Sequence, residues 1–247
     1  MIEHKIKHYS QPTNYSCSQT SLAMLLSFFG QDASPEDLIE QLPVRLDDRT
    51  GRQWGSIPQD IARLCIDRGF DVTIYTADYE IIDQSWLNLA QSDILNRLRA
   101  VKDLRNVASL GKDSSMVYAQ SYIDFLNKDG KLNIVPYMST HLLDNLLANS
   151  PLFFNVNMAI LNKAGRRTMT GLRSDEPNDV DGILQNHSVI LFGKSNNENY
   201  LLADPWRESE NGFREIEPEH LLAAMAGAQM ECNNLLFQIE PKRETTK

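Results

Sequence analysis

Apolar residues recur at helical spacing in the stretch that follows Ser16, and the pattern stops at Gly30. The positions that share one face of this predicted helix are Leu22, Leu25, Leu26 and Phe29. Ser16 is a favourable N-cap, and Gln19 three residues later completes a capping-box pattern. The pattern therefore predicts a buried helix over residues 16–30, with Cys17 in its first turn.

Alternating and helical patterns divide the rest of the chain into further elements. Helices are predicted from residue 34, over 59–68, in two or three segments between 78 and 130, from 139 or 140 to about 148, and from 218 to about 226. Strands are predicted at 4–10, 70–76, 131–136, 152–161, 187–193, 199–204 and 233–240. Residues 162–186 are polar and lack an apolar period, so a long functional loop is expected there.

Helical patterns dominate the first half of the chain and strand patterns dominate the second, which predicts an α+β fold. With 247 residues the chain is long enough to bury one sizeable core, and no linker rich in Pro, Gly or Ser interrupts it. We therefore expect a single domain over residues 1–247, with the helices at about 78–130 forming an insertion.

Composition and charge narrow the possible partners. Hydrophobic residues make up 42% of the chain, as in ordinary globular proteins, and the net charge of −9 argues against nucleic acid and anionic membranes. The sequence contains no apolar run of about 18 residues, and the first ten residues lack the apolar core of a signal peptide. The three cysteines have no CxxC spacing, which fits a reducing compartment. We expect a cytoplasmic protein.

A cysteine, a histidine and an aspartate occupy positions at which they could meet. Cys17 begins the predicted helix, where backbone N–H groups and the helix dipole favour a thiolate. His187 opens one predicted strand and Asp204 closes the next, so antiparallel pairing would bring both to one end of a hairpin. Asp204 would orient the imidazole, leaving its other nitrogen aimed at Cys17. Gln11 could donate its side-chain amide to an oxyanion, together with the Cys17 N–H.

This ordered set, with Gln11 six residues before Cys17, a distant His187 and an Asp204 followed by Pro-Trp, resembles the papain-like cysteine peptidases. Within them the sequence is most similar to the bacteriocin-processing peptidases, which cut after double-glycine leaders, and to their stand-alone relatives. The resemblance implies a papain-like fold, a thiolate–imidazolium pair, an orienting Asp or Asn and an oxyanion-hole Gln. It assigns these roles to Cys17, His187, Asp204 and Gln11. Trp206 would shield the His–Asp pair or pack as an ordinary core residue.

The resemblance covers residues 16–30, loosely 56–76, and 150–206, and it leaves 78–130 unmatched. Two features depart from the family pattern. Ser18 stands where a glycine usually follows the cysteine, and an attached membrane-spanning exporter is not expected. These departures are compatible with thiol chemistry and leave the substrate open.

The other cysteines, two further histidines and the acidic residues of the 162–186 loop are not expected to form a catalytic or metal-binding site. Cys65 and Cys232 lie among apolar neighbours and are expected in the core. His4 and His8 lie four residues apart but have no third ligand, so a zinc site is not expected. The acidic residues of the 162–186 loop lack the fixed Gly and Glu of a calcium loop and are expected to be solvated. They are Asp175, Glu176, Asp179 and Asp181.

We interpret the sequence as a cysteine peptidase-like hydrolase that cleaves a peptide or amide bond without a metal or organic cofactor. Residues 78–130 and 162–186 would wall its cleft and set its specificity. Two alternatives stay open: an acyltransferase or deconjugating enzyme with the same triad, in which an amine or thiol replaces water, and a catalytically silent peptide-binding module. The expected partner is a peptide or another amide-containing substrate, and the sequence does not indicate an oligomeric state.

Overall fold

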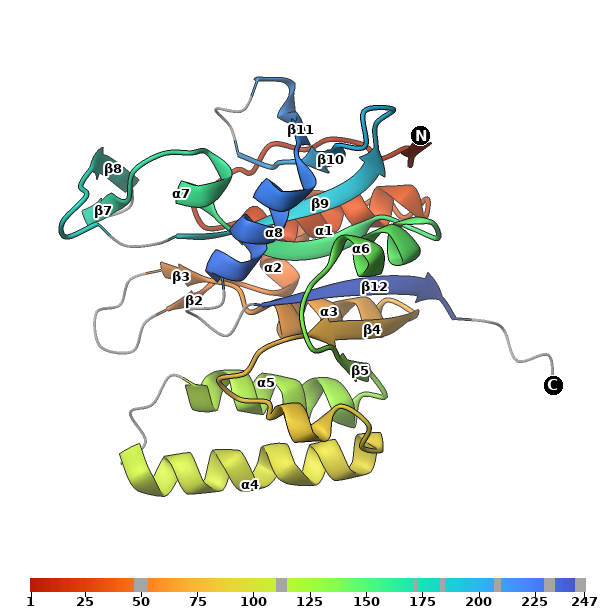
Figure 1. Cartoon of the computed structure of the whole chain (residues 1–247), viewed down its shortest axis with the longest axis vertical. Coiled ribbons are helices and arrows are strands. Elements are labelled where there is room, and N and C mark those ends of the chain that lie inside the picture. The colour runs from red at the N-terminus through yellow and green to blue at the C-terminus, as the bar shows by residue number, and fades with distance from the viewer. Residues whose placement is uncertain are drawn as a thin grey trace. The chain divides into compact units, whose positions relative to one another are not determined.

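The structure, a computed structural model of the 247-residue chain, describes residues 1–46, 53–109, 115–170, 173–182, 185–206, 210–228 and 234–242. The chain divides into two compact units, each made from two separate stretches of sequence (Figure 1). The first unit comprises Met1–Ser56 and Ser139–Ala228, and the second comprises Ile57–Met138 and Gln229–Lys247. All four residues of the predicted active site belong to the first unit.

The first unit mixes helices with antiparallel strands. Its helices are α1 (Cys17–Phe28), α2 (Pro35–Gln41), α6 (Thr140–Leu147), α7 (Met158–Leu161), the 3₁₀ turn η2 (Glu210–Gly212) and α8 (Pro218–Gly227). Its strands are β1 (Ile2–Glu3), β2 (Arg45–Leu46), β3 (Gln53–Gly55), β6 (Leu152–Asn157), β7 (Arg167–Thr170), β8 (Arg173–Pro177), β9 (Asn186–Lys194), β10 (Tyr200–Ala203) and β11 (Phe213–Ile216).

The strands of the first unit form an antiparallel sheet in the order β11-β10-β9-β6, and β1 also pairs with β9. Every residue of β6 and most of β9 are buried. Helix α1 packs against β9 and β6, and α8 packs against β6 (Figure 1). Two further pairs, β2 with β3 and β7 with β8, form separate two-stranded ribbons. The predicted strands at 187–193 and 199–204 are confirmed as neighbours.

Helix α1 is largely buried within the first unit. All of residues 18–26 are buried, so the helix is covered on all sides and not only on the single face that the apolar pattern predicted. Burying polar side chains is costly unless they are hydrogen-bonded. Ser18 Oγ lies 2.7 Å from Ser188 Oγ, and the Ser21 hydroxyl donates to the Ser188 carbonyl at 2.9 Å. These bonds tie α1 to β9.

The predicted start of α1 is confirmed, but the predicted capping box is wrong. Ser16 is the N-cap residue, yet its side chain makes no capping bond, and its hydroxyl oxygen accepts from the Thr13 N–H at 3.1 Å. The Gln19 amide donates to the Leu42 carbonyl at 2.7 Å and to the Ser56 hydroxyl at 2.8 Å. The loop before the helix has thus taken the Ser16 hydroxyl, and tertiary partners have taken the Gln19 amide.

The second unit contains the helices α3 (Pro58–Asp67), η1 (Gln84–Trp86), α4 (Gln91–Ser109) and α5 (Ser115–Asn127), and the strands β4 (Phe70–Thr76), β5 (Lys131–Ile134) and β12 (Leu235–Pro241). Strand β4 pairs antiparallel with β12 and parallel with β5. Helix α3 packs on β4, and α4 packs on α5. The helices predicted between 78 and 130 are therefore confirmed as η1, α4 and α5.

The structure differs from the sequence-based predictions in the regions 152–161, 4–10 and 162–186. The strand predicted at 152–161 ends at Asn157, because the Asn157 side chain accepts from the Ile160 N–H at 3.2 Å and caps the short helix α7. The strand predicted at 4–10 is wrong, since pairing in this region is confined to Ile2–Glu3. The region 162–186, predicted as a loop without regular structure, contains the hairpin β7–β8.

The sequence-based prediction also missed β11. Asn211 and Gly212, with φ of 62° and 70°, make a turn in the left-handed region. An Asn-Gly pair is a strong turn signal, and the strand follows it immediately. A strand at this position brings Arg214 opposite Leu202 of β10.

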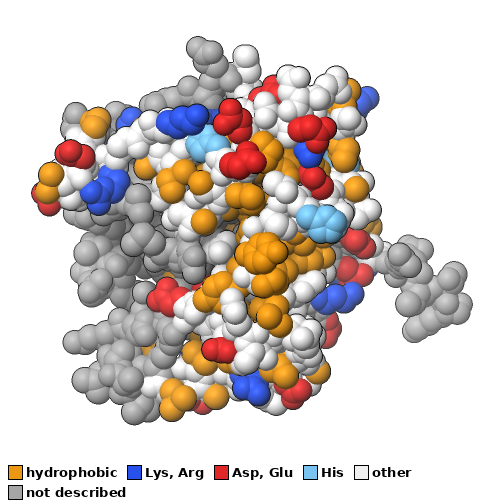
Figure 2. Space-filling view, in the orientation of Figure 1, with side chains coloured by type: hydrophobic (Ala, Val, Ile, Leu, Met, Phe, Trp, Pro, Cys, Tyr) orange, Lys and Arg blue, Asp and Glu red, His pale blue; other side chains and the backbone are white. Residues whose placement is uncertain are grey.

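Charged side chains of both signs are interspersed with apolar ones on the face shown in Figure 2. Large apolar side chains with substantial exposure include Leu104, Tyr137 and Val180. Single exposed apolar residues of this kind are normal for a protein surface. Among the helices that the structure describes, none is both long enough and apolar enough to span a bilayer.

Candidate active site

Cys17 is the first residue of α1, as predicted. It is partly exposed, whereas the residues on both sides of it, Ser16 and Ser18, are buried. The first N–H groups of a helix have no intrahelical acceptor, so the sulfur lies where the helix favours negative charge. The loop before α1 is anchored by the Gln11 N–H, which donates to the Pro205 carbonyl at 2.8 Å.

His187 and Asp204 form the predicted contact at one end of the β9–β10 pair. His187 is the second residue of β9, and Asp204 directly follows β10. The His187 Nε2 lies 2.7 Å from Asp204 Oδ1, and both side chains are buried. Asp204 Oδ1 also accepts the Trp206 N–H at 2.8 Å. Because Asp204 occupies Nε2, the other ring nitrogen, Nδ1, is the one left for the thiol.

The charges of this cluster favour a thiolate–imidazolium pair. Burial raises the pKa of Cys17, but a hydrogen bond to His187, the charge of that ring and hydrogen bonds from Ser188 outweigh it, so the pKa lies below its ordinary value of 9.0. Burial lowers the pKa of His187, whereas Asp204 and Cys17 together raise it to about 9. The pKa of Cys17 is thus lowered and that of His187 is raised, and both directions favour a thiolate beside an imidazolium.

Asp204 is held ionised and fixed in place. Burial raises its pKa, but the charge and hydrogen bond of His187 and the charge of Arg214 lower it to about 2. The Asp204 N–H donates to the Gly212 carbonyl at 2.8 Å, and its own carbonyl lies 2.8 Å from His8 Nε2. A carboxylate anchored through both backbone and side chain can orient an imidazole without rotating away.

Ser188 links the cysteine helix to the sheet. Its hydroxyl donates to Asn155 Oδ1 at 2.6 Å, and Ser18 Oγ lies 2.7 Å from the same hydroxyl. All three side chains are buried. Ser18, which departs from the family's usual glycine, therefore has a defined partner on β9, the strand that carries His187.

Gln11 lies at the start of the loop that leads to Cys17, and it is almost fully buried. Its side-chain Nε2 donates to the Thr13 carbonyl at 2.7 Å. This bond fixes the amide within the loop preceding the cysteine. The assignment of Gln11 to an oxyanion hole stays a prediction.

Trp206 lies beside the catalytic candidates. Its ring stands edge-on to the His187 ring, with centroids 6.2 Å apart. The residue is only partly buried. This position suits the predicted shielding of the imidazole.

Sequence reasoning missed two residues that contact Asp204, namely His8 and Arg214. His8 was considered only as a metal ligand, and Arg214 lay in a stretch with no predicted strand. The signal that could have identified Arg214 is the Asn-Gly turn followed by the alternating residues 213–216. No comparable local signal marks His8, because its contact depends on the path of the N-terminal segment.

The remaining candidate residues lie apart from this cluster. Cys65 is fully buried, and burial raises its pKa. Cys232 and the side chains of Asp175 and Glu176 lie outside the described residues. His4 Nε2 is 2.6 Å from the Leu147 carbonyl, a backbone contact. In the part of the chain that the structure describes, no group of three or more His, Cys, Asp or Glu residues could hold a metal ion.

Replacing Gly212 by alanine is expected to destabilise the support of Asp204. A Cβ at this position would lie 1.9 Å from His8 Nε2, and the φ of 70° is unfavourable for alanine. His8 must then move away and lose its contact with the Asp204 carbonyl. We expect the free energy of unfolding to fall by about 1–3 kcal/mol, measured by urea denaturation.

The matched control for this variant is Gly165→Ala. A Cβ at Gly165 meets no atom within 4 Å, and its φ is not in the left-handed region. Equal unfolding free energies for the Gly212→Ala and Gly165→Ala variants would contradict the expected strain.

Comparison with known proteins gives one family match. Residues 3–103 match the model described as Peptidase_C39 like family, which supports the resemblance to papain-like cysteine peptidases. The match includes Gln11 and Cys17 and ends before His187 and Asp204. It also runs into the segment 78–130, so the expectation that this whole segment is unmatched is wrong.

One similar solved structure is the crystal structure of a candidate C39-like peptidase from Bacillus anthracis. The similarity covers 98% of this chain and 97% of that chain, with 12% sequence identity and a TM-score of 0.48. No curated protein gives a significant match.

Proposed function

We propose that this chain is a papain-like cysteine peptidase that hydrolyses a peptide or amide bond with a Cys17–His187–Asp204 triad, and the family match of residues 3–103 supports this proposal. The observation that carries the proposal is the contact of 2.7 Å between His187 Nε2 and Asp204 Oδ1, and a hydrogen bond of Cys17 to His187 supports it. These residues come from a helix start, a strand start and a strand end that are far apart in sequence. A papain-like fold and a single domain over the whole chain are part of the same proposal.

The first half of the reaction forms an acyl-enzyme. The Cys17 thiolate adds to the carbonyl carbon, and the C=O electron pair moves onto oxygen. The Cys17 N–H and the Gln11 amide stabilise this oxyanion. When the tetrahedral intermediate collapses, the C–N bond breaks, and His187 gives its proton to the departing amine. A thioester on Cys17 and a neutral His187 remain.

The second half regenerates the enzyme. The neutral His187 takes a proton from water, and the resulting hydroxide equivalent adds to the thioester carbonyl. Collapse of this second intermediate breaks the C–S bond and releases the carboxylic acid. The thiolate returns with a protonated His187 beside it. Asp204 keeps the ring oriented and stabilises its charged form throughout.

The test uses a synthetic library of short peptides, including peptides with a Gly-Gly pair, incubated in water enriched in ¹⁸O. Hydrolysis is expected to give new peptide ends that carry one ¹⁸O in the C-terminal carboxylate, detected by mass spectrometry. The Cys17→Ala variant serves as the control for contaminating proteases. Cleavage that is equal in this variant would contradict the proposal.

The same experiment separates hydrolysis from the two alternatives. With glycinamide added as a competing amine, an acyltransferase would give the amide product without ¹⁸O. A silent binding module would retain peptides in the Cys17→Ala variant, while the wild-type protein would release no new ends.

A further inference from the structure

Arg214 lies on the strand next to Asp204. On β11 it pairs with Leu202 of β10, two residues before Asp204. Residues two apart on a strand share a face, so a long side chain at 214 can reach diagonally to 204. The Arg214 Nε forms an ion pair with Asp204 Oδ2 at 2.7 Å.

The two carboxylate oxygens of Asp204 therefore have different partners. Oδ1 contacts His187 Nε2 and accepts the Trp206 N–H, and Oδ2 forms the ion pair with Arg214 Nε. The Asp204 side chain is 0% exposed, and a buried carboxylate is costly without paired charge. His187 alone cannot supply a permanent positive charge, because it becomes neutral once during each proposed catalytic cycle. Arginine stays protonated at any pH at which the enzyme is folded.

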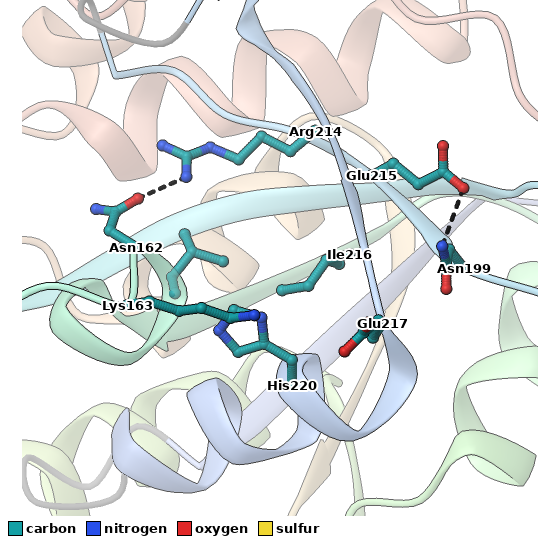
Figure 3. Close-up of a pocket in the computed structure, with 9 residues that line it drawn as sticks. Asn162, Lys163, Asn199, Arg214, Glu215, Ile216, Glu217 and His220 are labelled. Atoms are coloured by element: carbon teal, nitrogen blue, oxygen red, sulfur yellow. Dashed lines mark hydrogen bonds between the residues drawn. The ribbon is translucent and has the colours of Figure 1, made fainter.

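The other end of Arg214 faces outward. Its Nη1 donates to Asn162 Oδ1 at 2.5 Å, and its side chain is 26% exposed. Both residues line an open cavity of about 620 Å³, which Lys163, Ile216 and His220 also line (Figure 3). Figure 3 shows the guanidinium extending along one edge of this cavity toward Asn162. Small molecules in solution can therefore reach the Arg214 position.

We infer that Arg214 is a positioning residue that fixes Asp204, and through it His187, for reaction at Cys17. The inference rests on the proposed function. It assigns Arg214 no contact with substrate. Among the residues that the structure describes, the charged or titratable side chains that contact Asp204 are His187 from β9, Arg214 from β11 and His8 from the N-terminal segment.

The charges around Asp204 determine in which direction the loss of Arg214 shifts the pH dependence of thiolate formation at Cys17. Removing the positive charge of Arg214 raises the pKa of Asp204 toward its ordinary value, because Arg214 is one of the groups that lower it. Protonated Asp204 no longer stabilises the His187 imidazolium, and without that cation the Cys17 thiolate is lost. The acid limb of the pH profile, the range in which the Cys17 thiolate forms as the pH rises, should therefore move to higher pH when Arg214 is replaced.

The experiment measures the rate constant for alkylation of Cys17 by iodoacetamide as a function of pH. In Arg214→Met we expect the acid limb to move up by about one pH unit, which makes alkylation about tenfold slower at a given pH on that limb. Arg214→Lys, which keeps the charge, should move it less. Arg99→Met is the matched control, because Arg99 is an exposed arginine that also donates to an asparagine, Asn127.

Chemical rescue separates positioning from a general structural role. In Arg214→Ala, millimolar methylguanidinium should enter from the cavity side and restore the wild-type pH profile in a saturable way. Methylurea, which has a similar planar shape and no charge, should not restore it. A merely structural role for Arg214 would show no rescue by either compound.

The outcomes distinguish the role proposed for Arg214 from the proposed peptidase function. A folded Arg214→Met variant with an unshifted acid limb overturns the role of Arg214, and if that variant does not fold, Arg214→Gln is judged by the same criterion. A wild-type Cys17 that alkylates with an ordinary thiol pKa, by contrast, contradicts the proposed function itself. A shifted limb in Arg214→Met with rescue by methylguanidinium supports the inference.

Discussion

Replacing Cys17 by alanine is expected to lower kcat/KM for peptide cleavage by about 10⁴-fold or more. The thiolate forms the only covalent bond to substrate in the proposed reaction, so its loss removes the acyl-enzyme route entirely. The variant should keep its fold, because Cys17 is partly exposed, whereas residues 18–26 of the same helix are buried. The measurement is turnover of the most rapidly cleaved library peptide, with the folded state verified by circular dichroism.

The matched control for this variant is Cys65→Ala. Cys65 is a buried cysteine of α3 whose pKa is raised by burial, which keeps its thiol protonated and unreactive. Its replacement should lower the melting temperature and leave kcat/KM close to the wild-type value. Activity that survives in Cys17→Ala and disappears in Cys65→Ala would reverse the assignment of the nucleophile.

Replacing His187 by alanine is expected to lower kcat/KM by about 10³-fold to 10⁴-fold. Two effects combine: the leaving amine loses its proton donor, and the thiolate of Cys17 loses the group that lowers its pKa. In the wild-type enzyme the reactive pair exists between the lowered pKa of Cys17 and the raised pKa of His187, about 9. A bell-shaped dependence of kcat/KM on pH is expected, with an alkaline limb near pH 9, and steady-state kinetics across this range measures it.

His141→Ala is the control for this variant, because His141 is an exposed histidine of α6 whose ring contacts the Asn145 side chain. The His141→Ala substitution should change neither the maximum of kcat/KM nor the pH values at which its acid and alkaline limbs lie. An alkaline limb that persists unchanged in His187→Ala would show that another group produces it, and the role given to His187 would then be wrong.

The sequence was sufficient to predict the helix that begins at Cys17 and the contact between His187 and Asp204, because each of these residues is marked by a local pattern. Cys17 starts a strongly apolar helix, and the strands that carry His187 and precede Asp204 have clear apolar patterns. Antiparallel pairing of consecutive strands then brings the last two residues together without any further assumption. The observed contact of 2.7 Å between His187 and Asp204 agrees with that inference.

The parts that sequence reasoning missed depend on tertiary contacts. The capping-box pattern of Ser16 and Gln19 was overridden because Gln19 finds acceptors in Leu42 and Ser56. Strand β11 is short, and only its position next to β10 shows that Arg214 faces Asp204. Similarly, Ser18 looked like a departure from the family, whereas the structure gives it a buried partner in Ser188. Periodicity reveals which side of an element is buried, but it does not identify the partner across the interface.

The central claim is that His187 holds Cys17 as a thiolate, and the pH dependence of Cys17 alkylation by iodoacetamide tests it most directly. Peptide mapping by mass spectrometry reads the labelling of Cys17 separately from that of the other cysteines. The expected result is a wild-type midpoint below 9.0 that rises to 9.0 or above in His187→Ala, where the main groups that oppose the effect of burial on the thiol are gone. The same midpoint, at or above 9.0, in both proteins would contradict the claim.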